Sequence, residues 1–305
     1  MDVRLGINTC FAVKRWPRPA DWAPIVREHL GLRLVQHTFD LVDLSVDSAE
    51  IERQAEDLTW TAKDLDLDVA STFTGLAAYS SNLLLAPDAE TRAASRAWYA
   101  AAIRFTAAIG AQITGGHLGA FSVHDWNDAV AHADRWSDLK QSLAGLAAIA
   151  SEAGLEALVV ENLAAAREPS TMAMLADLLT TGGEGHVPIR ACIDVGHMCV
   201  PGTEGDDRDP YAWLRHLGAH APMVQLQQSD AAGDHHWPFT PAHDGDGRID
   251  PDRVLAALIE SGARRTDLIL EVIPPFEQAD GEVLQDLVVS VDRWRDALAR
   301  GGIPA

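Results

Sequence analysis

Short apolar segments rich in β-branched residues alternate with longer segments of helical periodicity along the whole chain. The apolar segments are nearly continuous rather than alternating, which is typical of parallel strands buried on both faces. Eight segments are expected to be strands: Leu5–Cys10, Leu32–Phe39, Asp68–Phe73, Ala111–His117, Ala157–Glu161, Ile189–Asp194, Met223–Gln228 and Leu268–Val272.

The segments between the expected strands have the length and periodicity of helices. They include Ser48–Leu65, Asp88–Ile109, Trp126–Ala153, Pro169–Leu179, Pro251–Glu260 and Glu282–Arg300. Residues typical of a helix start stand at Pro87–Asp88, Pro169–Ser170 and Asp250–Pro251, where a cap or a proline fits the first turn.

Eight strands, each followed by a helix, match the count of a closed parallel barrel. A chain of 305 residues has the usual length of one such barrel. An open doubly wound sheet would need a glycine-rich phosphate-binding turn after the first strand, and the segment GINTCFAVKRW does not provide one. Residues 1–305 are therefore predicted to form one α/β domain, a single (β/α)8 TIM barrel.

Composition excludes several classes of protein. With 24 Lys and Arg against 45 Asp and Glu, the net charge is −21, which argues against binding to nucleic acid. The sequence lacks an uninterrupted apolar stretch long enough for a membrane span and begins without a secretory signal. Cys10, Cys192 and Cys199 form no CxxC pair, which excludes a cysteine-built zinc site and indicates a reducing compartment. We therefore expect a cytoplasmic protein that forms a homodimer or homotetramer and acts on a small-molecule substrate.

Two segments depart from the barrel pattern. Gly75–Pro87 follows the third expected strand, and the polar, histidine-bearing Ser229–Arg248 follows the seventh. Long loops in compact domains are usually functional. In a barrel, loops that follow strands lie on the face where active sites form.

The last four expected strands end in residues that bind metal ions. One such residue by itself is usually a helix cap or part of a surface ion pair, but four on neighbouring strands can meet at one point of the rim. They are Glu161, Asp194, Gln227 and Glu271. Clustered carboxylates repel each other unless a cation lies among them or one holds a proton. Four oxygen donors suit Mn²⁺ or Mg²⁺ better than Zn²⁺.

This set of residues, with His197 three positions after Asp194, resembles the xylose isomerase-like barrel superfamily. The resemblance covers the whole chain and is greatest to the hydroxypyruvate isomerase and ketose epimerase branches. The run Gln227-Gln228-Ser229-Asp230 is similar to the branch that uses glutamine as its third metal ligand. Phe11–Trp16 and Phe73–Leu85 look most like erythrulose-phosphate epimerases, also called tetrulose-phosphate racemases.

The resemblance implies an isomerase or epimerase that moves protons on a small ketose or ketose phosphate. A divalent cation, Mn²⁺ first and Mg²⁺ or Co²⁺ next, would polarise the substrate carbonyl. The resemblance also implies that Glu161 and Glu271 form the acid/base pair, and that His197 binds a substrate oxygen. The best single expectation is 3-epimerisation of erythrulose phosphate.

Five further residues are candidates for substrate binding. His117 closes the fourth expected strand, where it has a functional or a structural role. His235 and His236 lie in the long seventh loop, and one of them is expected to contact the substrate. Lys14 and Arg15 follow the first strand; they are either solvated surface residues or the partners of a substrate phosphate.

Other activities stay open at this stage. The same metal centre could serve a dehydratase or a lyase, including one that cleaves C-glycosides, or an epimerase of free ketoses. A DNA-repair endonuclease of the same superfamily would need a basic groove, which the acidic composition disfavours. A non-catalytic sugar-binding barrel is also open; in such a protein, Glu161 and Glu271 could be replaced without loss of sugar binding.

Overall fold

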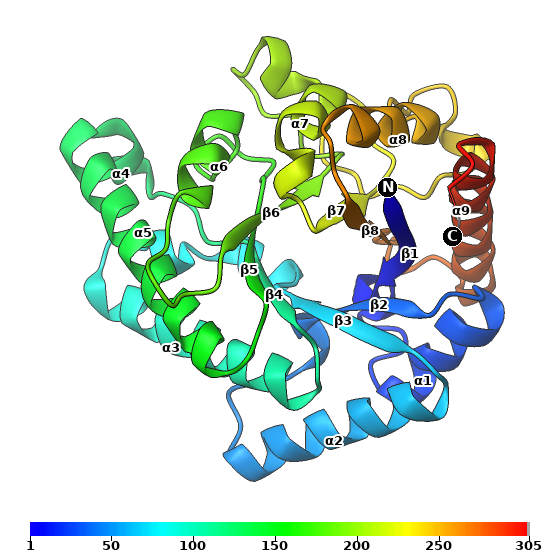
Figure 1. Ribbon diagram of the computed structural model, residues 1–305, viewed down its shortest axis with the longest axis horizontal. Helices are drawn as coiled ribbons and strands as arrows, with labels where there is room; N and C mark the ends of the chain where they lie inside the picture. Colours follow the sequence, from blue (N-terminus) through cyan, green and yellow to red (C-terminus); the bar gives the residue numbers. More distant parts are fainter. Residues whose placement is uncertain (304–305) are drawn as a thin grey trace.

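Eight parallel strands close into a barrel in the order of the sequence, which confirms the predicted fold. The structure is a computed structural model in which residues 1–303 are described, and Figure 1 shows the strands at the centre with the helices around them. The strands are β1 Asp2–Asn8, β2 Leu34–Thr38, β3 Asp68–Phe73, β4 Ile113–Gly116, β5 Ala157–Glu161, β6 Ile189–Asp194, β7 Met223–Leu226 and β8 Arg265–Leu270.

The helices differ most from those expected in two places, and α9 begins two residues earlier than expected. The expected helix Trp126–Ala153 is divided at Asp128, whose extended backbone ends α4 and whose carboxylate caps α5 by accepting from the N–H groups of Val130 and Ala131 at 2.9 Å. Pro169–Ser170 does not open α6, because Thr171 is its cap. The helices are α1 Pro19–Pro24, α2 Ser48–Asp64, α3 Ala89–Ala108, α4 Val123–Asn127, α5 Ala129–Glu152, α6 Met172–Leu179, α7 Pro210–Leu217, α8 Pro251–Glu260 and α9 Asp280–Arg300.

β8 begins three residues earlier than expected. Its polar residue Asp267 accepts two hydrogen bonds from Arg4 of β1, at 2.8 and 2.6 Å, and every residue of β8 pairs with β1. β7 and β8 end at Leu226 and Leu270, before the polar residues at the rim. Gln227 and Glu271 therefore lie just beyond their strands, in the segments that face the carboxyl end of the barrel.

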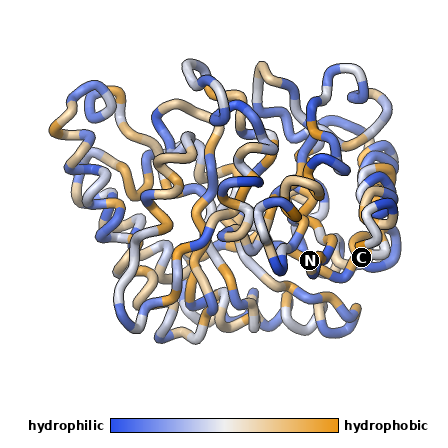
Figure 2. The backbone as a smooth tube through the Cα atoms, turned by 45° about the horizontal axis from the view of Figure 1, so that its top comes forward, coloured by the Kyte–Doolittle hydropathy of each residue, from blue (hydrophilic) through white to orange (hydrophobic). Residues whose placement is uncertain are grey.

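Apolar side chains contributed by six of the strands meet in the interior of the barrel. One interior cluster consists of Leu34, Phe73, Val159, Cys192, Met223 and Ile269. Figure 2 shows hydrophobic positions along the central strands and many hydrophilic positions on α9 at the edge of the molecule. Within residues 1–303, each helix is too short or too polar to span a membrane.

His37 of β2 is buried between the barrel and α1, with its ring 5.5 Å from that of Trp22. Burial lowers the pKa of this imidazole to about 3, from an ordinary value of 6.5. Between these two values the unfolded chain binds a proton that the folded chain does not bind, so stability falls as the pH falls from 6.5 toward 3. The contribution is about 1.4 kcal/mol per pH unit.

The His37→Gln variant is therefore expected to lose less stability on acidification than the wild type does. Between pH 6.5 and pH 5 the difference should reach about 2 kcal/mol, as measured by urea unfolding at each pH. His220→Gln, at an exposed position, serves as the control and should follow the wild type. Equal acid sensitivity of His37→Gln and the wild type would contradict the assignment.

Candidate metal centre and active site

Three carboxylates meet at the carboxyl end of the barrel. Glu161 and Asp194 are the last residues of β5 and β6, and Glu271 follows β8. One oxygen of each lies within 4.8 Å of the others. Their exposed fractions are 2%, 0% and 7%. A cation bound by all three would be shielded from water, and hard divalent ions prefer such oxygen ligands.

Burial is the largest influence on these acids. The pKa of Glu161 is raised to about 8, because burial and the neighbouring Asp194 carboxylate outweigh the opposing effect of His197. Burial together with the Glu161 carboxylate also raises the pKa of Glu271 well above its usual range. The raised pKa values show that the three buried carboxylates lack a compensating positive charge. Their oxygen atoms fit a divalent metal ion, which would supply that charge.

Glu271 is held by a buried network of amides. Asn8 Nδ2 and Gln225 Nε2 donate to its Oε1 atom at 2.9 and 2.8 Å. The same two amides donate to Gln36 Oε1 at 2.8 and 2.9 Å. Both acceptor positions of Oε1 are thereby used, which leaves Oε2 outside this network. The sequence signal for these positioning residues was a polar side chain within an otherwise apolar strand.

Gln227 lies in the site, but its amide is turned with the nitrogen toward the carboxylates. Its Nε2 donates to Asp194 Oδ1 at 3.1 Å and to Asp234 Oδ1 at 2.8 Å. Its Oε1 accepts the main-chain N–H of His236 at 2.6 Å. In this arrangement Gln227 orients Asp194 and the seventh loop. Its role as an oxygen ligand stays a prediction, and it requires the amide to turn over.

The long loop after β7 folds back over the site. Gln228 and Trp237 pair as a short antiparallel bridge, with N···O distances of 2.8 and 3.0 Å. His236 has φ of 49°, a left-handed conformation that costs roughly 1–3 kcal/mol for a non-glycine residue. It directs the imidazole inward, whereas His235 stacks on Trp237 at 3.9 Å and contacts Asp230. Of the two candidate histidines, the structure brings His236 to the site.

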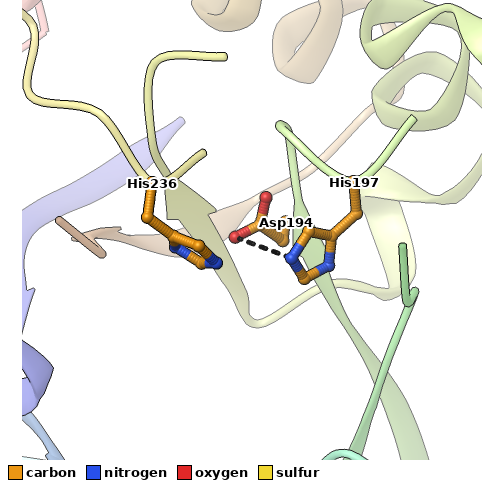
Figure 3. Close-up of side chains that lie close together, drawn as sticks. All are labelled: Asp194, His197 and His236. Carbon is orange, nitrogen blue, oxygen red and sulfur yellow. Dashed lines mark ion pairs between the residues drawn. The ribbon is translucent and has the colours of Figure 1, made fainter. Parts of the chain in front are cut away.

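Asp234 of the same loop was missed by the sequence reasoning. Its carboxylate lies 3.3 Å from His197 Nε2 and 3.3 Å from His236 Nε2. Figure 3 shows that His197 and His236 point toward each other across Asp194. The spacing Asp234-His235-His236 was the available signal, because in an extended segment the first and third residues point to the same side. Whether the loop would reach the barrel was not visible in the sequence.

The carboxylates around His197 decide its protonation in the absence of a metal ion. Burial lowers the pKa of His197, but Asp194 and Asp234 outweigh this effect and raise the pKa well above its usual value. Burial likewise lowers the pKa of His236, and Asp234 raises it overall. These histidines bring positive charge to a centre that is otherwise rich in carboxylates.

A narrow cavity opens directly onto this centre, and Glu161, Glu271 and His236 are among the residues that line it. Tyr79, from the long loop after β3, forms part of the wall and packs edge-on against His117 at 4.5 Å. His117 accepts the Gly119 N–H at Nδ1 and contacts Glu168 at Nε2. With both nitrogens engaged, His117 supports the wall, and its contact with a substrate stays a prediction.

The structure places Lys14 and Arg15 away from this cavity. Lys14 Nζ lies 4.0 Å from the centre of the Phe276 ring. Arg15 donates to Asp280 Oδ1 at 2.5 Å and to the Pro275 carbonyl at 2.6 Å. These contacts connect the loop after β1 to the loop after β8. Arg15 thus has partners other than a phosphate, and the predicted role of both residues in binding phosphate gains no support from their positions.

A wider cavity of about 510 Å³ lies at the opposite end of the barrel. Among its charged lining residues, Arg4 and Asp68 are paired with each other at 2.6 Å. Active sites of these barrels lie at the carboxyl ends of the strands. We therefore assign the chemistry to the narrow cavity beside the carboxylates.

Comparison with known proteins agrees with this architecture. The family described as "Xylose isomerase-like TIM barrel" matches residues 26–286, so the chain belongs to that family. A D-erythrulose 1-phosphate 3-epimerase of Brucella abortus (strain 2308) is 28% identical over 99% of this chain and 98% of its own length. The relatives place the chain among the isomerases and epimerases of the family, and it is therefore an enzyme.

Solved structures show the same fold over nearly the whole chain. A putative xylose isomerase from Rhodospirillum rubrum ATCC 11170 is 31% identical, with a TM-score of 0.88 over 96% of this chain and 99% of that chain. A D-psicose 3-epimerase from Clostridium cellulolyticum H10, solved with D-tagatose, is 15% identical, with a TM-score of 0.71 over 97% and 99% of the two chains. The second likeness concerns the fold alone.

Proposed function

We propose that this protein is a divalent-metal-dependent epimerase that inverts C3 of a small ketose phosphate, with a tetrulose phosphate as the substrate. The observation that carries the proposal is the buried group of Glu161, Asp194 and Glu271, of which the two glutamates line one cavity. The full-length similarity to a D-erythrulose 1-phosphate 3-epimerase supports the choice of substrate.

The two glutamates would transfer the proton. Glu161 and Glu271 reach the cavity from β5 and from the segment after β8. One carboxylate removes the proton from C3, beside the substrate carbonyl, and the other returns a proton to the opposite face. A bound divalent cation supplies polarisation of that carbonyl. Asn8 and Gln225 hold Glu271 through Oε1, so that Oε2 can face the substrate.

A free-ketose 3-epimerase is the second candidate. It is favoured by one observation, which is that the lining residues of the cavity include neither Lys14 nor Arg15. A phosphate is normally bound by such cations or by main-chain N–H groups. The comparison of a phosphorylated and a free tetrulose therefore separates the two candidates.

The test is incubation of the Mn²⁺-loaded enzyme in D2O with D-erythrulose 1-phosphate or with D-erythrulose, followed by NMR for the position of deuterium. Because C3 is the single stereocentre of these sugars and its inversion gives the enantiomer, inversion is followed by polarimetry. We expect one deuterium at C3, an unchanged carbon skeleton and inversion of C3, with a higher kcat/KM for the phosphate. Faster turnover of the free sugar would move the assignment to the second candidate. With the free sugar, whose C1 carries a hydroxyl, deuterium at C1 would indicate an aldose–ketose isomerase. With either sugar, loss of water would indicate a dehydratase, and each of these results would overturn the proposal.

A further inference from the structure

We infer that Tyr79 sets the length of the sugar that the site accepts, by closing the cavity beside the carboxylates, and that Asp40 holds it in the closed position. The nature of the ligand rests on the proposed function, whereas the closure can be measured without any sugar. The cavity has a volume of about 20 Å³, which is room for little more than one water molecule. A four-carbon sugar is several times larger, so part of the wall moves when the sugar binds.

Most of the wall belongs to the barrel itself. Thr38, Phe73 and Glu161 are the last residues of β2, β3 and β5, and they are fixed by the pairing of the strands. By contrast, the lid turn, Leu76–Ser80, lies in the long loop after β3, and each of its residues is half-buried or exposed. Segments with few buried contacts are the first to move in a folded protein. The lid turn is therefore the part of the wall that yields.

Tyr79 of the lid turn reaches from the surface to the carboxylates. The residue is 40% exposed, yet it lines the cavity together with Glu161 and Glu271. Burial and the Glu161 carboxylate raise the pKa of its hydroxyl well above the ordinary value, so the hydroxyl is at the inner end of the side chain. The ring packs edge-on against His117 at 4.5 Å. Tyr79 thus lies between solvent and the carboxylates.

Asp40, in the loop after β2, fixes the lid turn from outside. Its carboxylate oxygens accept the main-chain N–H groups of Leu76 at 2.6 Å and of Ala77 at 3.2 Å. A carboxylate at the first N–H groups of a helical turn is favourable. Gly75 leaves the space for this contact, because a Cβ atom there would lie 2.1 Å from Asp40 Oδ2. Asp40 is therefore a positioning residue, which acts through Tyr79.

A second cavity, of about 250 Å³, gives the lid turn space to move. Thr74 and Gly75 border both cavities, and Ala77 and Ala78 of the lid turn line the second one. On its other side this cavity is bounded by aromatic residues, among them Trp98. The lid turn can therefore swing away from the carboxylates when a sugar enters, and return over the bound sugar, without displacement of the core.

Closure by an aromatic ring limits the size of the ligand. Because the strands fix the rest of the wall, the distance to which Tyr79 returns sets the space that a sugar can occupy. A ketose of four carbons lets the ring return, whereas a ketohexose would hold the lid turn open and admit water. Rejection of one additional carbon unit by a rigid wall is worth roughly 10- to 200-fold in kcat/KM.

Cys10 reports on the closure in the absence of sugar. Its thiol lines the same cavity and the residue is 5% exposed. The Mn²⁺-loaded protein is treated with iodoacetamide, and the modification of each cysteine is followed by mass spectrometry of its peptides. We expect Tyr79→Ala and Asp40→Asn to increase the rate at Cys10 by about 10-fold, since each removes a contact that keeps the lid turn closed. Tyr79→Phe, which keeps the ring, and Asp43→Asn, at an exposed position of the same loop as Asp40, should match the wild type. Cys192, which is 0% exposed, should stay unmodified in every protein.

The accepted sugar should change with the same residue. In Tyr79→Ala, the kcat/KM for D-psicose relative to that for D-erythrulose is expected to rise by roughly 10-fold or more, whereas Tyr79→Phe should keep the wild-type ratio. An unchanged ratio, or unchanged protection of Cys10 in folded Tyr79→Ala, would overturn the inference. Failure to epimerise any sugar would instead contradict the proposed function, and the labelling of Cys10 would still decide whether Tyr79 closes the cavity.

Discussion

Replacing Glu271 with glutamine is expected to lower kcat for 3-epimerisation by about 10²–10⁴-fold, the usual contribution of a proton-transferring residue. Glutamine keeps the shape of the side chain and can still meet Asn8 and Gln225, but it cannot carry the proton. The same result is expected for Glu161→Gln. Because both residues also belong to the carboxylate group, bound metal is measured beside the rate.

Isotope exchange separates proton transfer from metal binding. If the two glutamates act on opposite faces of C3, a variant of one should still exchange the C3 deuteron of one epimer with solvent, although it no longer forms the other epimer. Glu161→Gln and Glu271→Gln should then retain exchange with different epimers. The exposed Glu282→Gln is the control and should match the wild type. Near-native turnover by a metal-loaded Glu161 or Glu271 variant would exclude that residue from proton transfer.

Removal of divalent cations with EDTA is expected to abolish turnover and to lower the Tm of the protein. Without a cation, the carboxylates of Glu161, Asp194 and Glu271 are crowded together in a buried group. An ion present at 100 times its Kd stabilises the fold by about 2.7 kcal/mol, which for a chain of 305 residues corresponds to a Tm change of roughly 4 °C. Mn²⁺, Co²⁺ or Mg²⁺ should restore both quantities.

Asp194→Asn tests the same centre through one residue. This substitution keeps the size of the side chain but removes a charged ligand, so addition of Mn²⁺ should raise its Tm much less than that of the wild type. Calorimetry of both proteins with and without EDTA measures the difference. Full turnover in a preparation shown to be free of metal would refute the metal-dependent mechanism.

The strands and the barrel could be predicted from local pattern because parallel strands in a barrel are buried on both sides. β3, β5 and β6 have the limits expected from their apolar runs. β8 does not, since Asp267 is polar and belongs to the strand only through its pairing with Arg4. Where a strand contains polar residues near the rim of a barrel, its end therefore cannot be predicted from the local pattern of apolar residues.

The carboxylate group was visible in the sequence for a geometrical reason. In a closed parallel barrel, the ends of all strands meet at one rim, so acidic residues at the ends of successive strands must converge. The sequence alone therefore places Glu161, Asp194 and Glu271 together. The support of Glu271 by Asn8 and Gln225 could be found only once the register of β1, β7 and β8 was known.

The loops were decided by tertiary structure alone. Their course depends on long-range contacts, such as the bridge between Gln228 and Trp237 that turns His236 inward and His235 outward. The same kind of contact joins Arg15 to Asp280, 265 residues away, and withdraws it from the cavity. A strand end constrains its side chain through the repeating geometry of the sheet. A loop side chain is placed by partners distant in sequence, and no local pattern specifies them.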